Sequence, residues 1–188
     1  RMEPVFMVLG QSAATAAVQA ITTGSTVQNI DVKSLQQKLV SDPLLDGSEP
    51  ETLVDNDQKE KVSIKGAWET VRGGYGRDVL VASIGANSEH SVTYKPNLAK
   101  AGKYELFTYF PNVENKSEQT TFKIGDGKMS KEVTVSEKQI KRIGLSSGEW
   151  VSLGTYQLEA GLNTFVEVSS KGSAGKITAD AVIWKPIH

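Results

Sequence analysis

Residues 102–111, Gly-Lys-Tyr-Glu-Leu-Phe-Thr-Tyr-Phe-Pro, are the longest run of strand-forming residues in the chain, and this run restricts the fold most. Side chains alternate along a strand, so every second residue from Tyr104 to Phe110 points to one face. Phe107 and Tyr109 point to the other. The first face has the composition of a core. The second carries two aromatic rings, which are either covered by another layer of protein or exposed as a platform for a ligand.

From about residue 50 onward the hydrophobic period is two. Short strand-like runs alternate with clusters of Gly, Asn, Ser and Lys, at a spacing of about 8–12 residues that is typical of a β-sandwich. The runs are 53–54, 62–64, 79–81, 92–94, 104–110, 121–124, 133–135, 151–158, 165–168 and 177–184. Residues 125–128, Gly-Asp-Gly-Lys, predict a tight hairpin. We therefore expect residues 49–188 to form a mainly β domain, an antiparallel, jelly-roll-like β-sandwich.

Residues 1–48 have a different pattern, which predicts a short helical segment in front of the sandwich. Val5–Leu9 is a continuous apolar run of the kind found in a fully buried strand. Ala13–Ile21 has high helix propensity, and Asp31 can cap a second helix with an apolar side. We expect a strand and two helices here, followed by a linker at 48–51.

Composition excludes several classes of protein. With 21 basic and 22 acidic side chains the formal charge is −1, so the chain lacks the basic surface of a nucleic-acid-binding protein. No apolar run approaches the roughly 20 residues of a membrane span. The absence of cysteine excludes disulfides and thiolate metal sites. The chain starts Arg-Met-Glu-Pro without a signal peptide, and we expect it to be part of a longer polypeptide.

Residues 1–17, RMEPVFMVLGQSAATAA, resemble the carboxyl end of the FAD-dependent oxidoreductase family found in bacterial polysaccharide-related genes. Residues 31–39 resemble the helix that follows in that family. The resemblance implies a strand, a Gly-containing turn and an Ala-rich helix whose start presents N–H groups to the flavin ring. The implied flavin contacts are Gly10, Gln11, Ser12 and Ala13. No G-x-G-x-x-G follows a strand here, so we expect FAD only in a full-length parent and not in these residues.

From about Thr52 the chain resembles the golvesin C-terminal-like domain, which also occurs in bacterial proteins labelled xanthan lyase. The matching segments, in the family's order, are 54–56, 66–68, 74–78, 92–96, 102–106, 109–111, 150–156 and 179–184. The resemblance implies a β-sandwich similar to carbohydrate-binding modules that accompany catalytic domains. It also implies a polysaccharide or cell-surface glycan as partner, and a secreted, periplasmic or cell-surface location.

Sugar binding needs aromatic faces beside groups that bond hydroxyls, and two places offer them. The glycine-rich loop 72–78 carries a tyrosine between guanidiniums, and the outward face of 102–111 carries two rings. The candidate ligand-binding residues are Arg72, Tyr75, Arg77, Asp78, Phe107 and Tyr109. Alternatively, Tyr75 folds back as a lid on the core, and the other two rings are covered by residues 1–48. The three tryptophans, Trp68, Trp150 and Trp184, lie in strand-like patterns and are expected in the core.

The sequence offers little for catalysis or metal binding. His90 lies in an apolar pattern that predicts a core or edge histidine, and His188 is the last residue, so a catalytic triad is not expected. Asp180, between apolar neighbours, is expected to be a buried acceptor of backbone N–H or arginine bonds. Asp55 and Asp57 offer oxygen ligands for Ca²⁺, or else form a turn with side-chain hydrogen bonds.

We therefore expect a non-catalytic accessory module that binds polysaccharide, from the carboxyl-terminal part of a larger bacterial polysaccharide-related protein. Two alternatives stay open. The chain could be part of an enzyme, either an FAD-dependent oxidoreductase or a xanthan-lyase-like polysaccharide lyase. It could also be a structural module, with residues 1–48 forming a dimer contact or docking on the sandwich.

Overall fold

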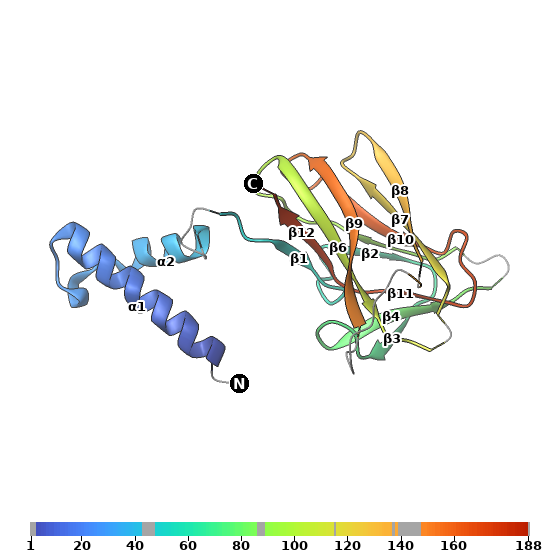
Figure 1. The fold of residues 1–188 in the computed structure, drawn as a ribbon, viewed down its shortest axis with the longest axis horizontal. Coiled ribbons are helices and arrows are strands. Elements are labelled where there is room, and N and C mark those ends of the chain that lie inside the picture. Colours follow the sequence, from blue (N-terminus) through green and yellow to red (C-terminus); the bar gives the residue numbers. More distant parts are fainter. Residues whose placement is uncertain are drawn as a thin grey trace. The chain divides into compact units, whose positions relative to one another are not determined.

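The computed structural model describes residues 3–42, 48–85, 89–114, 116–136, 138 and 148–187 (Figure 1). The chain divides into two compact units, Arg1–Pro50 and Glu51–His188. The first is helical and the second consists of strands. The change from a helical to a two-residue hydrophobic period near residue 50 coincides with this division.

The helical unit contains two α-helices and a short 3₁₀ turn among its described residues. They are α1 (Glu3–Thr23), η1 (Val27–Asn29) and α2 (Val32–Ser41). Helix α1 ends at Thr23. Gly24 follows with a positive φ of 64°, which allows the backbone to turn, and the Ser25 N–H donates to the Ala20 carbonyl at 3.0 Å. The predicted cap of α2 is confirmed, because an Asp31 carboxylate oxygen accepts from the N–H groups of Lys33 and Ser34.

The prediction of a buried strand at Val5–Leu9 is wrong. These residues are the first turns of α1, and their side chains are about half or more exposed. A buried strand needs neighbouring strands for its backbone groups, and the described part of the helical unit has none. A helix satisfies the same groups within its own segment.

Helix α1 also changes the membrane prediction. Its residues Val5–Thr23 are long and apolar enough to cross a membrane, by length and composition only. Small and polar residues such as Gly10 and Ser12 divide this segment into short apolar runs. The length of uninterrupted apolar runs therefore does not predict a helix that could span a membrane. The same composition is found in core helices of larger domains, and length alone does not distinguish the two.

The described residues of the second unit form three antiparallel sheets, as predicted for a β-sandwich. The four-stranded sheet contains, in spatial order, β1 (Thr52–Val54), β12 (Val182–Pro186), β6 (Gly102–Pro111) and β9 (Gly148–Leu158). The five-stranded sheet contains β2 (Val62–Lys65), β5 (Ser91–Tyr94), β10 (Phe165–Ser169), β7 (Gln119–Gly125) and β8 (Ser130–Ser136). The three-stranded sheet contains β11 (Lys176–Ala179), β4 (Asp78–Ser83) and β3 (Glu69–Arg72).

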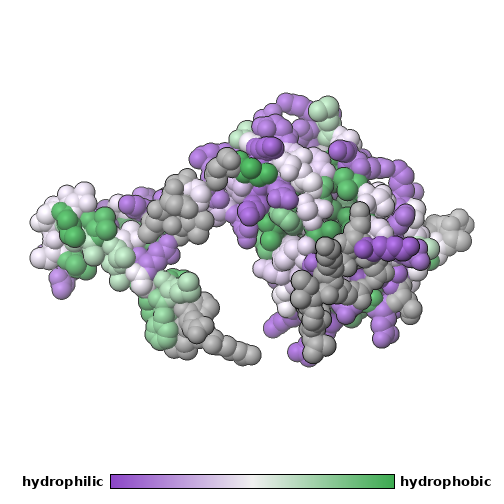
Figure 2. Space-filling model, viewed as in Figure 1, coloured by the Kyte–Doolittle hydropathy of each residue, from purple (hydrophilic) through white to green (hydrophobic). Residues whose placement is uncertain are grey.

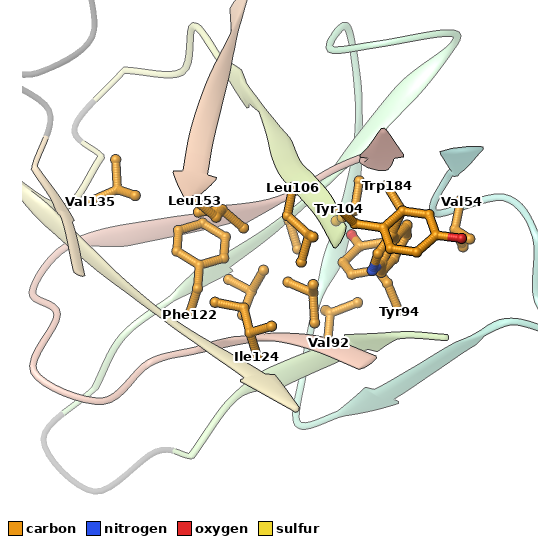
Figure 3. Close-up of a cluster of buried hydrophobic side chains, with 14 of the residues drawn as sticks. Val54, Val92, Tyr94, Tyr104, Leu106, Phe122, Ile124, Val135, Leu153 and Trp184 are labelled. Atoms are coloured by element: carbon orange, nitrogen blue, oxygen red, sulfur yellow. The ribbon is translucent and has the colours of Figure 1, made fainter. Parts of the chain in front are cut away.

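The core lies between the four-stranded and five-stranded sheets (Figure 3). Leu106 and Trp184 project into it from the first sheet, and Phe122 and Ile124 from the second; all four are at most 2% exposed. Burial alternates along β6, so the predicted core face of 102–111 is confirmed. Burying a large apolar side chain contributes about 1.5–3 kcal/mol, so this continuous cluster is what holds the two sheets together.

Two strand predictions need correction. The expected strand 177–184 is two strands, because β11 pairs with β4 whereas β12 pairs with β6. Asp180 and Ala181 join them at the point where the chain passes between sheets. Strand β3 was not predicted, because its four exposed residues lack an apolar face. The predicted hairpin at 125–128 is confirmed between β7 and β8, where the Asp126 N–H donates to the Met129 carbonyl.

Candidate functional site

Three aromatic rings meet on the outward face of the four-stranded sheet, and we call Tyr75, Tyr109 and Trp150 the aromatic trio. The ring centroid of Trp150 lies 5.2 Å from that of Tyr75 and 5.3 Å from that of Tyr109. The two tyrosine rings are 5.8 Å apart. The rings are inclined to one another by 59–72°, and all three side chains are half-buried. They therefore form a non-planar aromatic surface that is partly open to solvent.

The two predicted ligand regions, the loop 72–78 and the outward face of β6, lie together in this trio. Tyr109 is on β6 and pairs with Trp150 on β9. Tyr75 comes from the loop between β3 and β4 and lies against both rings. Figure 2, viewed as in Figure 1, shows hydrophobic patches among pale and hydrophilic residues over the sandwich. The expectation that residues 1–48 cover these rings stays a prediction.

Trp150 was expected in the core, and that prediction is wrong. Its ring lies on the outer face because the pairing of β6 with β9 shifts between Leu106 and Phe107, which pair with Gly154 and Ser152. Leu153 is thus an extra residue, and Gly154 has a positive φ of 104°. Such a bulge reverses which residues of β9 face the core. Leu153 and Leu158 are therefore both buried, although they are five residues apart and would lie on opposite faces of a regular strand. Trp184 is buried as expected, and Trp68 packs at the margin of the core.

Asp180 holds the Tyr75 loop in place. It is 1% exposed, and its carboxylate accepts from the Tyr75 N–H at 2.9 Å and from the Ala181 N–H at 2.8 Å. Its prediction as a buried acceptor of backbone bonds is confirmed. Burial raises the pKa of Asp180 to about 7; the two N–H bonds lower it, and the nearby charges of Asp55 and Asp78 raise it further.

Glycine is needed beside this carboxylate. Gly74 has a φ of +80°, and a Cβ there would overlap an Asp180 carboxylate oxygen. The backbone therefore approaches Asp180 closely enough for the Tyr75 N–H to reach it only because Gly74 has no side chain. The loop sequence Gly-Gly-Tyr-Gly thus places one ring on the trio.

The other predicted ligand residues are not in the trio. Arg72 lines a separate hollow of about 360 Å³ together with Lys176 and Glu114. Arg77 is exposed on the loop, and its carbonyl accepts from the Gly73 N–H at 3.2 Å. Asp78 accepts from the Asn56 side-chain amide at 2.8 Å.

Phe107 lies on the same face of β6 as Tyr109 and is half-buried. It pairs with Ile183 on β12 and with Ser152 on β9. It therefore extends the apolar surface beside the trio toward β12.

Asp55 and Asp57 form a hydrogen-bonded turn. The Asp55 carboxylate accepts from the Asn56 N–H at 2.7 Å, and its carbonyl accepts from the Gln58 N–H at 3.1 Å. Burial raises the pKa of Asp55, with the Asn56 bond opposing it. Within the ranges that the structure describes, no group of three or more His, Cys, Asp or Glu side chains is arranged to hold a metal ion. Asp46, which could have supplied a further oxygen ligand to a Ca²⁺ site at Asp55 and Asp57, lies outside the described residues.

The implied flavin contacts do not fit FAD in this chain. Gly10, Gln11, Ser12 and Ala13 lie in the middle of α1, whereas the resemblance implied a turn at a helix start. N–H groups in a helix interior donate to the carbonyls of the preceding turn and are not directed at a ligand. The expectation of a turn here is wrong for this structure.

Two family comparisons cover most of the chain. The golvesin C-terminal domain family matches residues 52–185. The FAD-dependent oxidoreductase family matches residues 1–39. The boundary between the two matches falls close to the division between the helical unit and the sandwich.

Individual relatives agree with the first family. A xanthan lyase from Bacillus sp. (strain GL1) is 30% identical over 139 residues, which are 71% of this chain and 14% of the relative. The structure of a Paenibacillus xanthan lyase aligns with a TM-score of 0.64 at 22% identity, over 73% of this chain and 13% of that one. The chain thus spans a small part of these relatives.

The fold is also found in carbohydrate-binding proteins. A family 35 carbohydrate-binding module from Clostridium thermocellum aligns with a TM-score of 0.50 at 16% identity, over 74% of this chain and all of the module (100%). A Podospora anserina β-(1,4)-mannanase with such a module aligns with a TM-score of 0.54 at 15% identity, over 75% of this chain and 28% of that one. These similarities show the β-sandwich fold, and the match over residues 52–185 shows that the chain belongs to the golvesin C-terminal domain family.

Proposed function

We propose that the sandwich is a non-catalytic accessory module that binds polysaccharide through the aromatic trio. The observation that carries the proposal is the meeting of Tyr75, Tyr109 and Trp150 on an outer face, 5.2–5.8 Å apart and partly exposed. Tyrosine and tryptophan side chains that gather on an outer face, half-buried and partly open to solvent, are typical of an interaction site. The C–H faces of a pyranose ring stack on such rings, while polar groups nearby bond its hydroxyls.

The relatives support this proposal. One is a xanthan lyase, and two solved structures with the same fold contain carbohydrate-binding modules. We propose that this chain has the corresponding accessory role in a larger bacterial polysaccharide-related protein. We propose a secreted or cell-surface location, because the polysaccharide that such an accessory module would bind lies outside the cell.

Affinity electrophoresis tests the proposal. The chain is run in native gels containing xanthan, glucomannan or mixed-linkage β-glucan, and we expect at least one of them to retard it. The Tyr75→Ala variant should run faster than the wild-type chain in that gel. Met129→Ala, which removes an exposed side chain in the β7–β8 turn outside the trio, is the control and should be retarded like the wild-type chain. Equal mobility of all three proteins with every polysaccharide would contradict the proposed function.

A second candidate concerns the parent protein. The match of residues 1–39 to the FAD-dependent oxidoreductase family favours a parent with a flavin domain. In that parent, α1 and α2 would pack on the flavin domain, which would cover the exposed apolar residues of α1 such as Phe6 and Met7. The full-length gene product should then absorb at the flavin wavelengths after purification. A colourless full-length protein that takes up no added FAD would rule this candidate out.

A further inference from the structure

The outward face of the five-stranded sheet carries a cleft of about 690 Å³. This volume lies within the range of about 300–1,000 Å³ that is typical of ligand sites. Its floor comes from the three central strands, with Ser91 on β5, Glu167 and Ser169 on β10, and Lys123 on β7. These four side chains are half-buried. In the strand register, Ser169 on β10 pairs with Ser91 on β5, and Glu167 on β10 pairs with Lys123 on β7.

Two ion pairs stand at the sides of the cleft. Lys65 on the edge strand β2 bonds Glu89 at 2.7 Å. On the other edge strand, β8, Glu132 bonds Lys171 at 2.8 Å. Within each ion pair the positive and negative charges cancel. The remaining charged groups of the lining are Lys123 and Glu167. The cleft therefore has one cation and one carboxylate in its floor and no net charge.

One wall of the cleft is fixed by two hydrogen bonds between His90 and Ser170. The His90 N–H donates to the Ser170 hydroxyl at 3.0 Å, and the Ser170 N–H donates to the His90 carbonyl at 2.9 Å. The His90 ring is 8% exposed and meets the Trp68 ring edge-on at 6.2 Å. This wall of the cleft is thus held by hydrogen bonds between the residue that precedes β5 and the residue that follows β10.

The floor has hydrogen-bonding groups left for a ligand. Within the described part of the chain, the Ser91 and Ser169 hydroxyls and the Lys123 ammonium make no side-chain hydrogen bond or ion pair. Glu167 accepts one bond, from the Thr93 hydroxyl at 3.2 Å, and a carboxylate can accept several. A sugar hydroxyl can donate to a carboxylate and accept from an ammonium at the same time, and bonds to charged groups are the stronger ones.

We propose that this polar cleft is a second saccharide-binding site, which takes a neutral, hydroxyl-rich segment of a polysaccharide. It lies on the sheet opposite the aromatic trio and shares no residue with it. The balanced charge of the lining favours a neutral segment over a polyanion. Two sites on opposite faces would let one module hold two chains, or two segments of one chain, and binding would gain from the linkage.

Chemical-shift mapping tests the second site separately from the first. The full chain, labelled with ¹⁵N, is titrated to millimolar concentration with cellohexaose, mannohexaose or xylohexaose. We expect amide shifts at Ser91, Lys123, Glu167 and Ser169 that saturate with their own dissociation constant. Shifts confined to the trio would overturn the second site and leave the proposed function standing. Shifts confined to the cleft would support the second site and contradict the role of the trio, whereas no shifts with any hexasaccharide would overturn the second site.

Substitution of the floor cation provides the matched comparison. Lys123→Met keeps the aliphatic stem and removes the charge, and we expect it to weaken binding at the cleft about tenfold, as loss of a hydrogen bond to a charged group does. Lys59→Met, in the exposed turn after β1, is the control and should bind like the wild-type chain. An unchanged dissociation constant at the cleft in Lys123→Met would overturn the proposed role of the floor. The amide spectrum of each variant shows whether it is folded.

Discussion

The two outward faces of the sandwich are built from different chemistry. The four-stranded sheet carries three aromatic rings that contact one another at 5.2–5.8 Å. The five-stranded sheet carries a cleft of about 690 Å³ lined by hydroxyls, lysines and glutamates. Both faces cover the same core, so the core does not determine their composition. The two faces therefore offer different contacts, aromatic rings on one and hydrogen-bonding groups on the other.

The two faces also differ in what supports them. The trio depends on one loop residue, Tyr75, which a buried carboxylate holds through a single N–H bond of 2.9 Å. The floor of the polar cleft depends on central strands that pair on both sides. We therefore expect changes near Asp180 to affect the aromatic face strongly, and changes at the polar face to have small effects on stability.

The largest expected effect is the pH dependence that Asp180 gives to stability. Its pKa is raised from the ordinary value of 3.8 to about 7 in the folded chain. Between these values the folded state binds more protons than the unfolded state, so the free energy of unfolding falls as pH rises from about 4 to 7. Above about pH 7 the decrease in the free energy of unfolding is complete and amounts to at most about 4 kcal/mol.

Asp180→Asn isolates this contribution, because the amide keeps an acceptor oxygen for the Tyr75 N–H and cannot ionise. Urea denaturation of both proteins at several pH values measures it. The stability of the wild-type chain relative to Asp180→Asn should decline across this range. A constant difference between acid and neutral pH would show that the Asp180 pKa is not raised.

A smaller effect is expected when Gly74 receives a side chain. Gly74→Ala combines backbone strain at a φ of +80° with overlap on the Asp180 carboxylate, and we expect it to lower the free energy of unfolding by about 2–4 kcal/mol. Gly172→Ala is the matched control, since Gly172 has a φ of +71° and open space around its Cβ position. Gly172→Ala should lower the free energy of unfolding by about 1 kcal/mol, because it adds backbone strain alone. Equal costs for both variants would show that Asp180 does not restrict the loop.

Removal of a trio ring should affect binding more than folding. We expect Trp150→Ala to weaken polysaccharide binding about tenfold or more, since the ring lies on the outer face beside two tyrosines. Its stability cost should be smaller than that of Trp184→Ala, because Trp184 is 0% exposed and truncation of a buried aromatic costs about 3–5 kcal/mol. Affinity electrophoresis and urea denaturation give the two values. A Trp150→Ala chain that binds normally would remove the main difference between the faces.

The smallest effect is expected at the rim of the polar face. Lys65 and Glu89 form an ion pair at 2.7 Å, but their side chains are 67% and 84% exposed. Water and salt screen such pairs, so Lys65→Met should leave the denaturation midpoint unchanged at physiological ionic strength. A clear decrease of the midpoint would mean that the rim pairs help to hold the five-stranded sheet.

Much of the sandwich could be predicted from the sequence because it depends on local patterns. The alternation in 102–111 gave the correct core face, and the Gly-Asp-Gly-Lys turn gave the β7–β8 hairpin. Capping by Asp31 is likewise a local property. The strand at 5–9 was predicted wrongly because a continuous apolar run fits a buried strand and a helix equally well.

The candidate site was only partly predictable. Tyr75 and Tyr109 were both recognised as exposed aromatic candidates, but their contact depends on tertiary structure. Trp150 was missed because the bulge beside Gly154 reverses the alternation of β9, although a glycine inside a strand pattern is a signal for such a bulge. The polar cleft was missed because its residues come from separate strands and carry no motif.

The most direct test of the account is the fluorescence of Trp150 during polysaccharide binding. Trp184 is 0% exposed, and Trp68, whose ring contacts His90 in the lining of the polar cleft, is first replaced by phenylalanine so that Trp150 is the reporter. If sugars stack on the trio, added polysaccharide should shift the tryptophan emission to shorter wavelength, and the shift should be absent in Trp150→Phe. An unchanged spectrum with a polysaccharide that binds, or a shift that persists in Trp150→Phe, would contradict binding at the aromatic trio.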